Sequence, residues 1–216
     1  FNSTYVIIIS IIFYLVLRSK SDLLVSSETG SGKTIAYYLA VYDDIISKKL
    51  KKNSSPYVVI VTPTRELAKQ VYEEGLWLFE NENFEIITAI GGMDVKKERK
   101  KLLKKIHMLV GTPGRINDHL RKNNLFLTNL SAIVLDEADE ILDLGFKDDL
   151  DKIMNKIPKT SKKLMFSATL PHKIIKLADK YQNNPIKIKT NTSLTSHKDI
   201  TYESYFLNEK DIENAI

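Results

Sequence analysis

The sequence has no cysteine among its 216 residues, and its four histidines are scattered. These absences exclude a disulfide framework, thiolate catalysis and a cysteine-rich metal site, and the histidine positions suggest no other metal centre. A chain without cysteine is compatible with a reducing compartment. We therefore expect an intracellular protein, while the sequence does not distinguish between cytoplasm, nucleus and organelle.

The sequence also lacks an apolar run long enough to span a bilayer. Its longest run, YVIIISIIFYLVL at residues 5–17, has 13 residues, whereas a membrane-spanning helix needs roughly 20. No basic residue precedes this run and no small-residue cleavage site is clear, which disfavours a secretory signal. We interpret the run as a buried strand or helix, and we expect no membrane association.

A strong charge of either sign is absent as well. The formal net charge is +5, with 27% charged and 43% hydrophobic residues, values that are ordinary for a globular protein. This balance permits nucleic acid as a partner without demanding it. The length suits one packed α/β domain rather than two.

What the chain does contain, from Leu23 onward, is an alternation of apolar strand-like runs with helical patterns. Strands are expected at residues 22–27, 57–64, 84–90, 107–113, 130–137, 162–169 and 185–189. Helices are expected at residues 33–50, 65–79, 95–107, 114–122, 138–157 and 172–182. This order predicts an α/β fold with a central parallel sheet and helices on both faces. In such a sheet, ligands bind at the carboxyl ends of the strands.

The stretch SSETGSGKT, which ends at Thr34, has the pattern of a phosphate-binding loop, although Ser27 replaces the usual first glycine. It follows an expected strand and opens an expected helix. Glycines let backbone N–H groups surround phosphate oxygens, Lys33 would neutralise the phosphates, and the Thr34 hydroxyl would bind Mg²⁺. A glycine- and serine-rich turn with no ligand is the alternative. The candidate nucleotide-binding residues are Ser27, Glu28, Thr29, Gly30, Ser31, Gly32, Lys33 and Thr34.

A second candidate site is the stretch IVLDEADE, in which an apolar strand ends at Asp136 and Glu137. An aspartate in this place holds Mg²⁺ through its water shell in phosphate-loop NTPases. Glu137 would then orient or deprotonate the attacking water. The alternative is that these acidic residues only favour the amino end of the following helix. An upstream phosphate loop favours the catalytic interpretation.

Six short motifs in this order resemble the DEAD-box RNA helicases. They are TGSGKT (29–34), PTREL (63–67), GG (91–92), TPGR (112–115), DEAD (136–139) and SAT (167–169). The resemblance covers Asp22 to about Thr190 and implies a RecA-like domain that binds ATP, Mg²⁺ and RNA. It further implies that a second RecA-like domain of the same protein supplies an arginine finger and half of the RNA cleft.

The resemblance also assigns roles to residues outside the phosphate loop. Contacts with the RNA sugar–phosphate backbone are implied for Pro63, Thr64, Arg65, Gly91, Gly92, Thr112, Pro113, Gly114 and Arg115. Such contacts carry no base information, so binding should be independent of sequence and sensitive to salt. Coupling of hydrolysis to strand separation, through a bond between Asp139 and the SAT segment, is implied for Asp139, Ser167, Ala168 and Thr169. TPGR taken alone would be interpreted as a turn that starts a helix.

The chain departs from the DEAD-box pattern at both ends. That family reads adenine with a glutamine upstream of the phosphate loop, and here the first glutamine is Gln70. One hypothesis is that residues 1–20 are translated intron from an A/T-rich genome, and a genuine targeting segment is another. We expect a helicase domain at 21–190, a polar linker at 191–200 and the truncated start of a second RecA-like domain at 201–216. Such a fragment should hydrolyse ATP poorly by itself.

Two other functions remain open from the sequence. One is a non-catalytic module that binds RNA or a protein partner on a helicase scaffold that has lost its adenine reader. The other is a DNA-directed helicase or an unrelated phosphate-loop NTPase. The lysine-rich helix at 95–107 is interpreted as a solvated face rather than as a nucleic-acid site.

Overall fold

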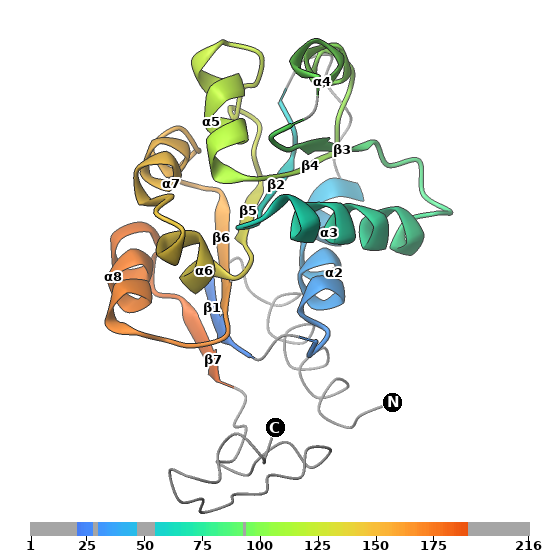
Figure 1. The fold of residues 1–216 in the computed structure, drawn as a ribbon. Helices are drawn as coiled ribbons and strands as arrows, with labels where there is room; N and C mark the ends of the chain where they lie inside the picture. The colour runs from blue at the N-terminus through green and yellow to red at the C-terminus, as the bar shows by residue number, and fades with distance from the viewer. Residues whose placement is uncertain (1–20, 28–29, 47–54, 93, 190–216) are drawn as a thin grey trace, which may run out of the picture.

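Seven parallel strands form one sheet in the computed structural model, which describes residues 21–27, 30–46, 55–92 and 94–189 (Figure 1). The strands are β1 (Leu23–Ser26), β2 (Val58–Val61), β3 (Ile86–Ala89), β4 (Met108–Gly111), β5 (Ala132–Leu135), β6 (Lys162–Ser167) and β7 (Ile186–Lys189). Each expected strand is therefore confirmed. Glu28, Thr29 and the segments expected at 1–20, 191–200 and 201–216 lie outside the described residues.

Seven helices connect the strands in the described part of the chain. They are α2 (Lys33–Ile46), α3 (Arg65–Leu78), α4 (Val95–Leu102), α5 (Pro113–Arg121), α6 (Ala138–Asp143), α7 (Lys147–Met154) and α8 (His172–Tyr181). None of the helices within these described segments is long and apolar enough to cross a membrane.

Two helix predictions were wrong in extent. The helix expected at 95–107 ends at Leu102 because the backbone of His107 already joins the sheet, where its N–H donates to Glu85 O at 2.9 Å. The helix expected at 138–157 is interrupted at Gly145, whose φ of 82° suits glycine and breaks the pattern into α6 and α7.

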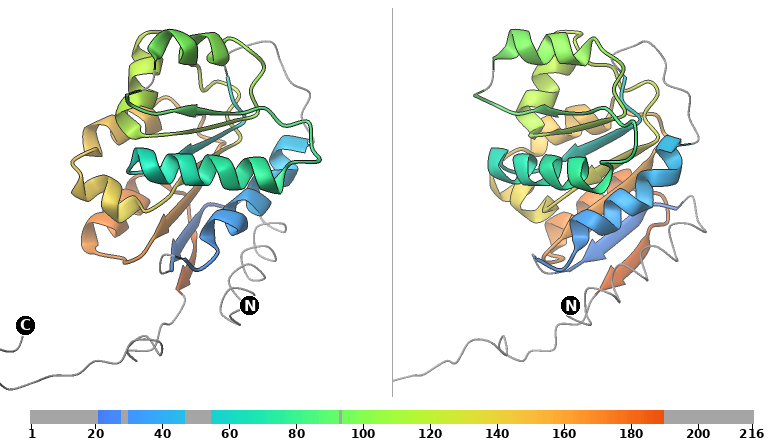
Figure 2. Two further views of the ribbon diagram at one scale, coloured as in Figure 1. Left: turned by 45° about the vertical axis from the view of Figure 1, so that its right-hand side comes forward. Right: turned by 90° about the vertical axis from the view of Figure 1, so that its right-hand side faces the viewer.

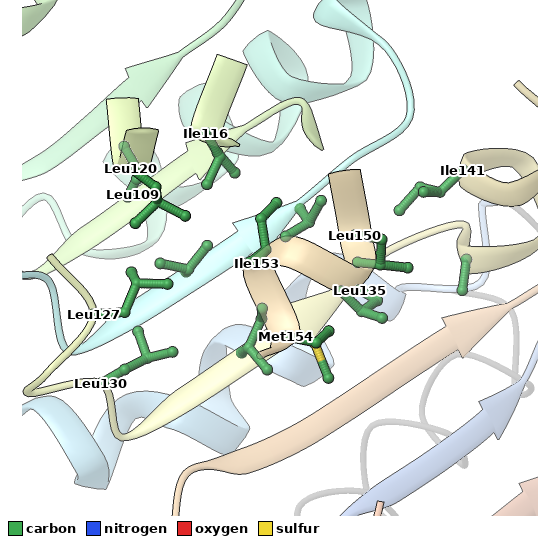
Figure 3. Packing of buried hydrophobic residues seen from close by; sticks show 14 of the residues in the cluster. Leu109, Ile116, Leu120, Leu127, Leu130, Leu135, Ile141, Leu150, Ile153 and Met154 are labelled. Atoms are coloured by element: carbon green, nitrogen blue, oxygen red, sulfur yellow. The ribbon is translucent and has the colours of Figure 1, made fainter. Parts of the chain in front are cut away.

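The strands are short apolar runs because both of their faces are covered. Successive side chains of a strand point to opposite faces of the sheet. On one face, side chains such as Val58 and Ile60 pack with α2 and α3. On the opposite face, side chains such as Val59 and Val61 pack with α4 to α8. Figure 2 shows these two helical layers, and Figure 3 shows leucine and isoleucine side chains of α5 and α7 meeting those of β4 and β5.

The strand order β3-β4-β2-β5-β6-β1-β7 divides the carboxyl edge of the sheet into two neighbouring halves. The phosphate loop follows β1, the DEAD motif follows β5 and the SAT motif follows β6, so the nucleotide motifs share one half. The PTREL, GG and TPGR motifs follow β2, β3 and β4 and share the other half. Adjacent strands β2 and β5 form the boundary between the two halves.

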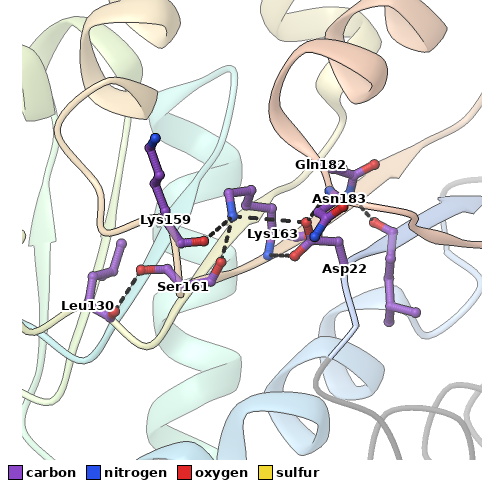
Figure 4. Close-up of polar contacts among 8 residues, drawn as sticks. Asp22, Leu130, Lys159, Ser161, Lys163, Gln182 and Asn183 are labelled. Carbon is purple, nitrogen blue, oxygen red and sulfur yellow. Dashed lines mark hydrogen bonds and ion pairs between the residues drawn. The ribbon is translucent and has the colours of Figure 1, made fainter.

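Buried Asp22 fastens the opposite, amino-terminal edge of the sheet (Figure 4). Its carboxylate accepts hydrogen bonds from the backbone N–H groups of Lys163 at 2.8 Å and Asn183 at 2.7 Å. The side-chain Nε2 group of Gln182 donates hydrogen bonds to Leu23 O and to Lys163 O. These bonds tie β1, β6 and the segment before β7 together, which fixes the strand from which the phosphate loop departs.

Candidate nucleotide and nucleic-acid sites

The phosphate loop leaves β1 and ends where α2 begins at Lys33. Gly30 and Gly32 have φ values of 73° and 80°, a backbone conformation that glycine adopts without strain. The Lys33 side chain is buried, and its Nζ donates to Ser27 O at 2.9 Å. The loop thus holds a buried ammonium group and the amino end of a helix together, which is the arrangement that binds phosphate.

Asp136 is buried at the end of β5, where its backbone N–H donates to Val61 O at 2.9 Å. Its Oδ2 accepts from the Tyr37 hydroxyl at 3.1 Å and its Oδ1 from the Glu137 N–H at 3.0 Å. Burial raises the pKa of Asp136, and the charge of Lys33 opposes this shift. The carboxylate is thus fixed in orientation and would be stabilised further by a cation.

Glu137 has a left-handed backbone conformation, with φ 49° and ψ 53°. A non-glycine residue in this region is held there by its surroundings, and such residues cluster at functional sites. Burial, a hydrogen bond with Glu140 and the charge of Asp136 raise the pKa of Glu137 to about 7. A carboxyl group with this pKa can both hold and release a proton near neutral pH, as a general base requires.

The phosphate loop and the DEAD motif face one pocket of about 380 Å³. The predicted residues that line it are Gly30, Gly32, Lys33, Thr34, Asp136 and Glu137. Ser27 and Ser31 do not line it; their hydroxyl groups share a hydrogen bond at 2.5 Å. The pocket is completed by two residues of α3 that the sequence motifs did not indicate, Gln70 and Glu74, whose side chains share a hydrogen bond at 3.0 Å.

The oxygen donors in this pocket fit Mg²⁺. A buried carboxylate and a hydroxyl, from Asp136 and Thr34, are the ligand types that this cation prefers. The Tyr37 phenol donates to the Asp136 carboxylate and so helps to hold it in place. Burial raises the pKa of Tyr37 well above its ordinary value, so the phenol stays protonated and donates.

A contact between the DEAD and SAT motifs joins the segments after β5 and β6. Asp139 Oδ2 accepts from the Thr169 hydroxyl at 3.0 Å and from the Thr169 N–H at 3.1 Å, while Ser167 Oγ donates to Thr169 O at 2.6 Å. Burial disfavours the charged carboxylate of Asp139, but the hydrogen bonds that it accepts from the Thr169 hydroxyl and N–H outweigh this effect and lower the pKa of Asp139. The bond that the resemblance predicts is present, and its coupling role stays a prediction.

The other half of the sheet edge forms a groove of about 810 Å³. Seven of the nine residues predicted to contact RNA line it: Pro63, Thr64, Arg65, Gly91, Thr112, Gly114 and Arg115. The groove also includes residues that no motif indicated, from α5, α7 and the turn between α6 and α7: Asn117, Asp118, Arg121, Leu144, Phe146, Asp149 and Lys152. Pro113 is buried in the first turn of α5 rather than in the lining.

The two glycines after β3 let the Arg65 guanidinium lie close to the turn. A Cβ on Gly91 would lie 3.1 Å from Arg65 Nη2, and one on Gly92 would lie 2.5 Å from Nη1. Gly92 also has φ 80°, which disfavours other residues. The exposed guanidinium of Arg65 therefore rests against the GG turn and faces the groove.

Comparison with known proteins shows the family of this chain. A family model described as DEAD/DEAH box helicase matches residues 9–177. The chain belongs to the DEAD/DEAH box helicase family. Among solved structures, a DEAD box protein from the hyperthermophile Methanococcus jannaschii superposes with a TM-score of 0.77 and 38% identity, covering 85% of this chain and 49% of that one. The yeast DEAD-box splicing factor Prp28 gives a TM-score of 0.77 at 29% identity, covering 83% of this chain and 43% of that one. The RecA-like fold class is thereby confirmed.

Curated DEAD-box relatives are longer than this chain. The DEAD-box ATP-dependent RNA helicase RhpA of Helicobacter pylori (strain B128) is 37% identical over 195 residues, which cover 90% of this chain and 39% of RhpA. The DEAD-box ATP-dependent RNA helicase CshA of Bacillus cereus (strain ATCC 10987 / NRS 248) is 39% identical over 168 residues, which cover 78% of this chain and 31% of CshA. The chain thus spans well under half the length of these relatives.

Two buried contacts at the candidate sites of this DEAD-box chain were missed in the sequence. Tyr37 is one residue of an apolar helix pattern, and nothing local shows that its hydroxyl reaches Asp136. Glu98 lies in a lysine-rich helix, yet its side chain is buried and binds Arg115 and His119. A signal for Glu98 existed: Val95, Glu98 and Leu102 share one helical face, so an acidic residue occupies an otherwise apolar stripe. The neighbouring lysines are exposed, as predicted for a solvated face.

Replacement of Tyr37 by phenylalanine is expected to raise the Mg²⁺ concentration needed for tight ADP binding by about tenfold. The reason is the loss of one hydrogen bond to a buried charged group, which contributes roughly 1.5–3 kcal/mol. Titration calorimetry of ADP at graded Mg²⁺ concentrations measures this shift. Tyr38→Phe is the matched control, because the neighbouring buried hydroxyl binds Val71 O instead of Asp136. Equal Mg²⁺ requirements in both variants would contradict the prediction.

Proposed function

We propose that this chain is the ATP- and RNA-binding RecA-like domain of an RNA helicase that works together with a second RecA-like domain. The observation that carries the proposal is the division of one sheet edge into a nucleotide pocket and an adjacent groove, whose lining includes the PTREL and TPGR arginines. The two meet at the β2–β5 boundary, where the Asp136 N–H donates to Val61 O. A change in the bound nucleotide that moves Asp136 would therefore act on β2, the strand that PTREL follows.

In the nucleotide pocket, Lys33 and the backbone of the glycine-rich loop would bind the phosphates of ATP. Thr34 and Asp136 would hold Mg²⁺, Asp136 through a water molecule, and the cation when bound would neutralise charge on the transferred phosphoryl group. Glu137 would orient the attacking water or take its proton. Asp139 and the SAT segment would transmit the state of this site to the second domain.

In the groove, Arg65, Arg115 and the amides near the glycines would bind the RNA sugar–phosphate backbone. Backbone contacts position a strand without reading its bases. We accordingly propose binding that is independent of sequence, with local strand separation when the second domain closes on the groove. Turnover would depend on an arginine finger from that domain, which raises phosphoryl-transfer rates by roughly 10³–10⁵.

Arg65→Ala is expected to weaken the binding of single-stranded RNA by about tenfold and to reduce the slope of log K against log salt by about one. The exposed Arg65 guanidinium faces the groove and would neutralise one phosphate. Fluorescence anisotropy with labelled RNA at several salt concentrations measures both quantities. Lys69→Ala on the same helix is the control, because Lys69 is exposed outside the groove lining.

Three results would redirect this proposal. Equal losses in the Arg65 and Lys69 variants would mean that RNA binds elsewhere on the chain. Competition by DNA of the same sequence as strongly as by RNA would favour a DNA-directed helicase. A protein that binds RNA but shows no Lys33-dependent nucleotide binding would instead be a non-catalytic RNA-binding module.

A further inference from the structure

One buried carboxylate connects three segments that shape the groove. Glu98 of α4 has a side chain that is 5% exposed, although the lysines around it are in solvent. Its Oε1 accepts from the Ile90 N–H at 3.2 Å. Its Oε2 accepts from Arg115 Nε at 2.7 Å and bonds to His119 Nε2 at 2.8 Å. The Ile90 donor follows β3, whereas the Arg115 and His119 donors both lie on α5.

These donors belong to elements of the groove rather than to α4 itself. Ile90 directly precedes the Gly91–Gly92 turn, against which the Arg65 guanidinium rests. Arg115 is the last residue of TPGR, and its side chain is only 11% exposed where it reaches the groove. His119 is 1% exposed, one helical turn further along α5, and anchors the same carboxylate to the core. A continuous set of contacts thus runs from Arg65 through the GG turn and Glu98 to Arg115.

The charge of Glu98 opposes what the groove is proposed to do. A groove for a polyanion gains affinity from each cation that neutralises a phosphate. Glu98 compensates part of the Arg115 charge, so by electrostatics alone its removal should strengthen RNA binding. Buried ion pairs are in addition weak stabilisers compared with apolar packing. A buried acid at this place is therefore better explained by geometry than by charge or stability.

We propose that Glu98 is a positioning residue that fixes the Arg115 guanidinium and the Gly91–Gly92 turn in the geometry that binds an RNA backbone. This inference rests on the proposed function of the groove. Glu98 does not touch the RNA. It acts through Arg115 and the Ile90 amide, which it holds from behind the groove.

Two substitutions separate geometry from charge. Glu98→Gln keeps the size but turns an NH₂ group toward donors that need an acceptor. Glu98→Asp keeps the charge but shortens the reach, so that one carboxylate no longer serves both Ile90 and Arg115. If Glu98 acts by positioning, both variants should bind single-stranded RNA about tenfold more weakly than the parent chain. If only the charge of Glu98 matters, Glu98→Gln should bind RNA more tightly and Glu98→Asp should bind it unchanged. Glu73→Gln on α3 is the control, because Glu73 is exposed and outside the groove lining.

Three further measurements distinguish positioning from damage to the fold. ADP affinity should stay within twofold of the parent chain in every variant. Thermal unfolding reports whether each variant is folded. In NMR spectra, the Arg115 Nε–H signal and the Gly91 and Gly92 amide signals should move in Glu98→Gln and stay in place in Glu73→Gln.

The outcomes are distinguishable. RNA binding that is unchanged or stronger in folded Glu98→Gln, or unchanged in folded Glu98→Asp, would overturn the positioning role and leave the proposed function intact. Unmoved Arg115 and glycine signals would overturn it as well. A parent chain that binds no RNA, while still binding ADP, would overturn the RNA function of the groove and this inference with it.

Discussion

Glu137→Gln is expected to reduce ATP turnover by about 10²–10⁴-fold, the usual contribution of a general base. The amide keeps the size of the side chain but cannot take a proton from water. Glu137 is held in a left-handed conformation at the edge of the phosphate pocket, with a pKa raised to about 7 chiefly by burial. The measurement is RNA-stimulated phosphate release by a protein in which this chain precedes a second RecA-like domain.

Nucleotide binding separates this effect from a damaged pocket. ADP affinity should remain close to that of the unmodified protein, because Glu137 is proposed to act on the water and not on the phosphates. Glu80→Gln, at an exposed position beyond the end of α3, is the control for the same chemical change. Normal turnover in Glu137→Gln would refute the role assigned to Glu137.

Lys33→Ala is expected to weaken ADP binding by roughly 30-fold to several thousand-fold. Removing one partner of a buried, hydrogen-bonded charge pair costs about 2–5 kcal/mol. The Lys33 ammonium is buried against the loop carbonyl of Ser27, where it would meet the phosphates. Titration with fluorescent ADP and GDP on the chain measures the loss. Lys100→Ala in α4 is the control, because Lys100 is exposed and far along the chain from the pocket lining.

Comparison of the two nucleotides addresses the missing adenine reader. A preference for ADP over GDP that depends on Lys33 would mean that a group other than an upstream glutamine reads the base. Equal, Lys33-dependent binding of both would mean a working phosphate site without base selection. Binding of either nucleotide that does not change in Lys33→Ala would refute the phosphate loop itself.

Local patterns were sufficient for much of the fold. Each strand is a short apolar run bounded by turn residues, and such runs are recognisable because strands of a covered parallel sheet bury both faces. The phosphate loop was predicted because its glycines, Lys33 and Thr34 act through backbone conformation and a helix start, which are properties of contiguous residues. The helix boundaries near His107 and Gly145 were missed because sheet pairing and a positive φ override helical periodicity there.

The motif order along the chain indicated one nucleotide site and one RNA-contact set, but not how they lie relative to each other. Only the strand order decides that β2, β3 and β4 gather the RNA motifs while β1, β5 and β6 gather the nucleotide motifs. Strand order depends on packing between segments that are distant in sequence, and no local pattern records it.

The sequence by itself determined the alternation of strands and helices, the phosphate loop, the DEAD carboxylates and the family that these motifs indicate. The tertiary structure decided which side chains support them: Tyr37 behind Asp136, and Glu98 behind Arg115 and the GG turn. A hydroxyl on an apolar helix and an acid among lysines each have an ordinary local interpretation. Their partners lie 99 and 17 residues away, and only the folded chain brings those partners within hydrogen-bonding distance.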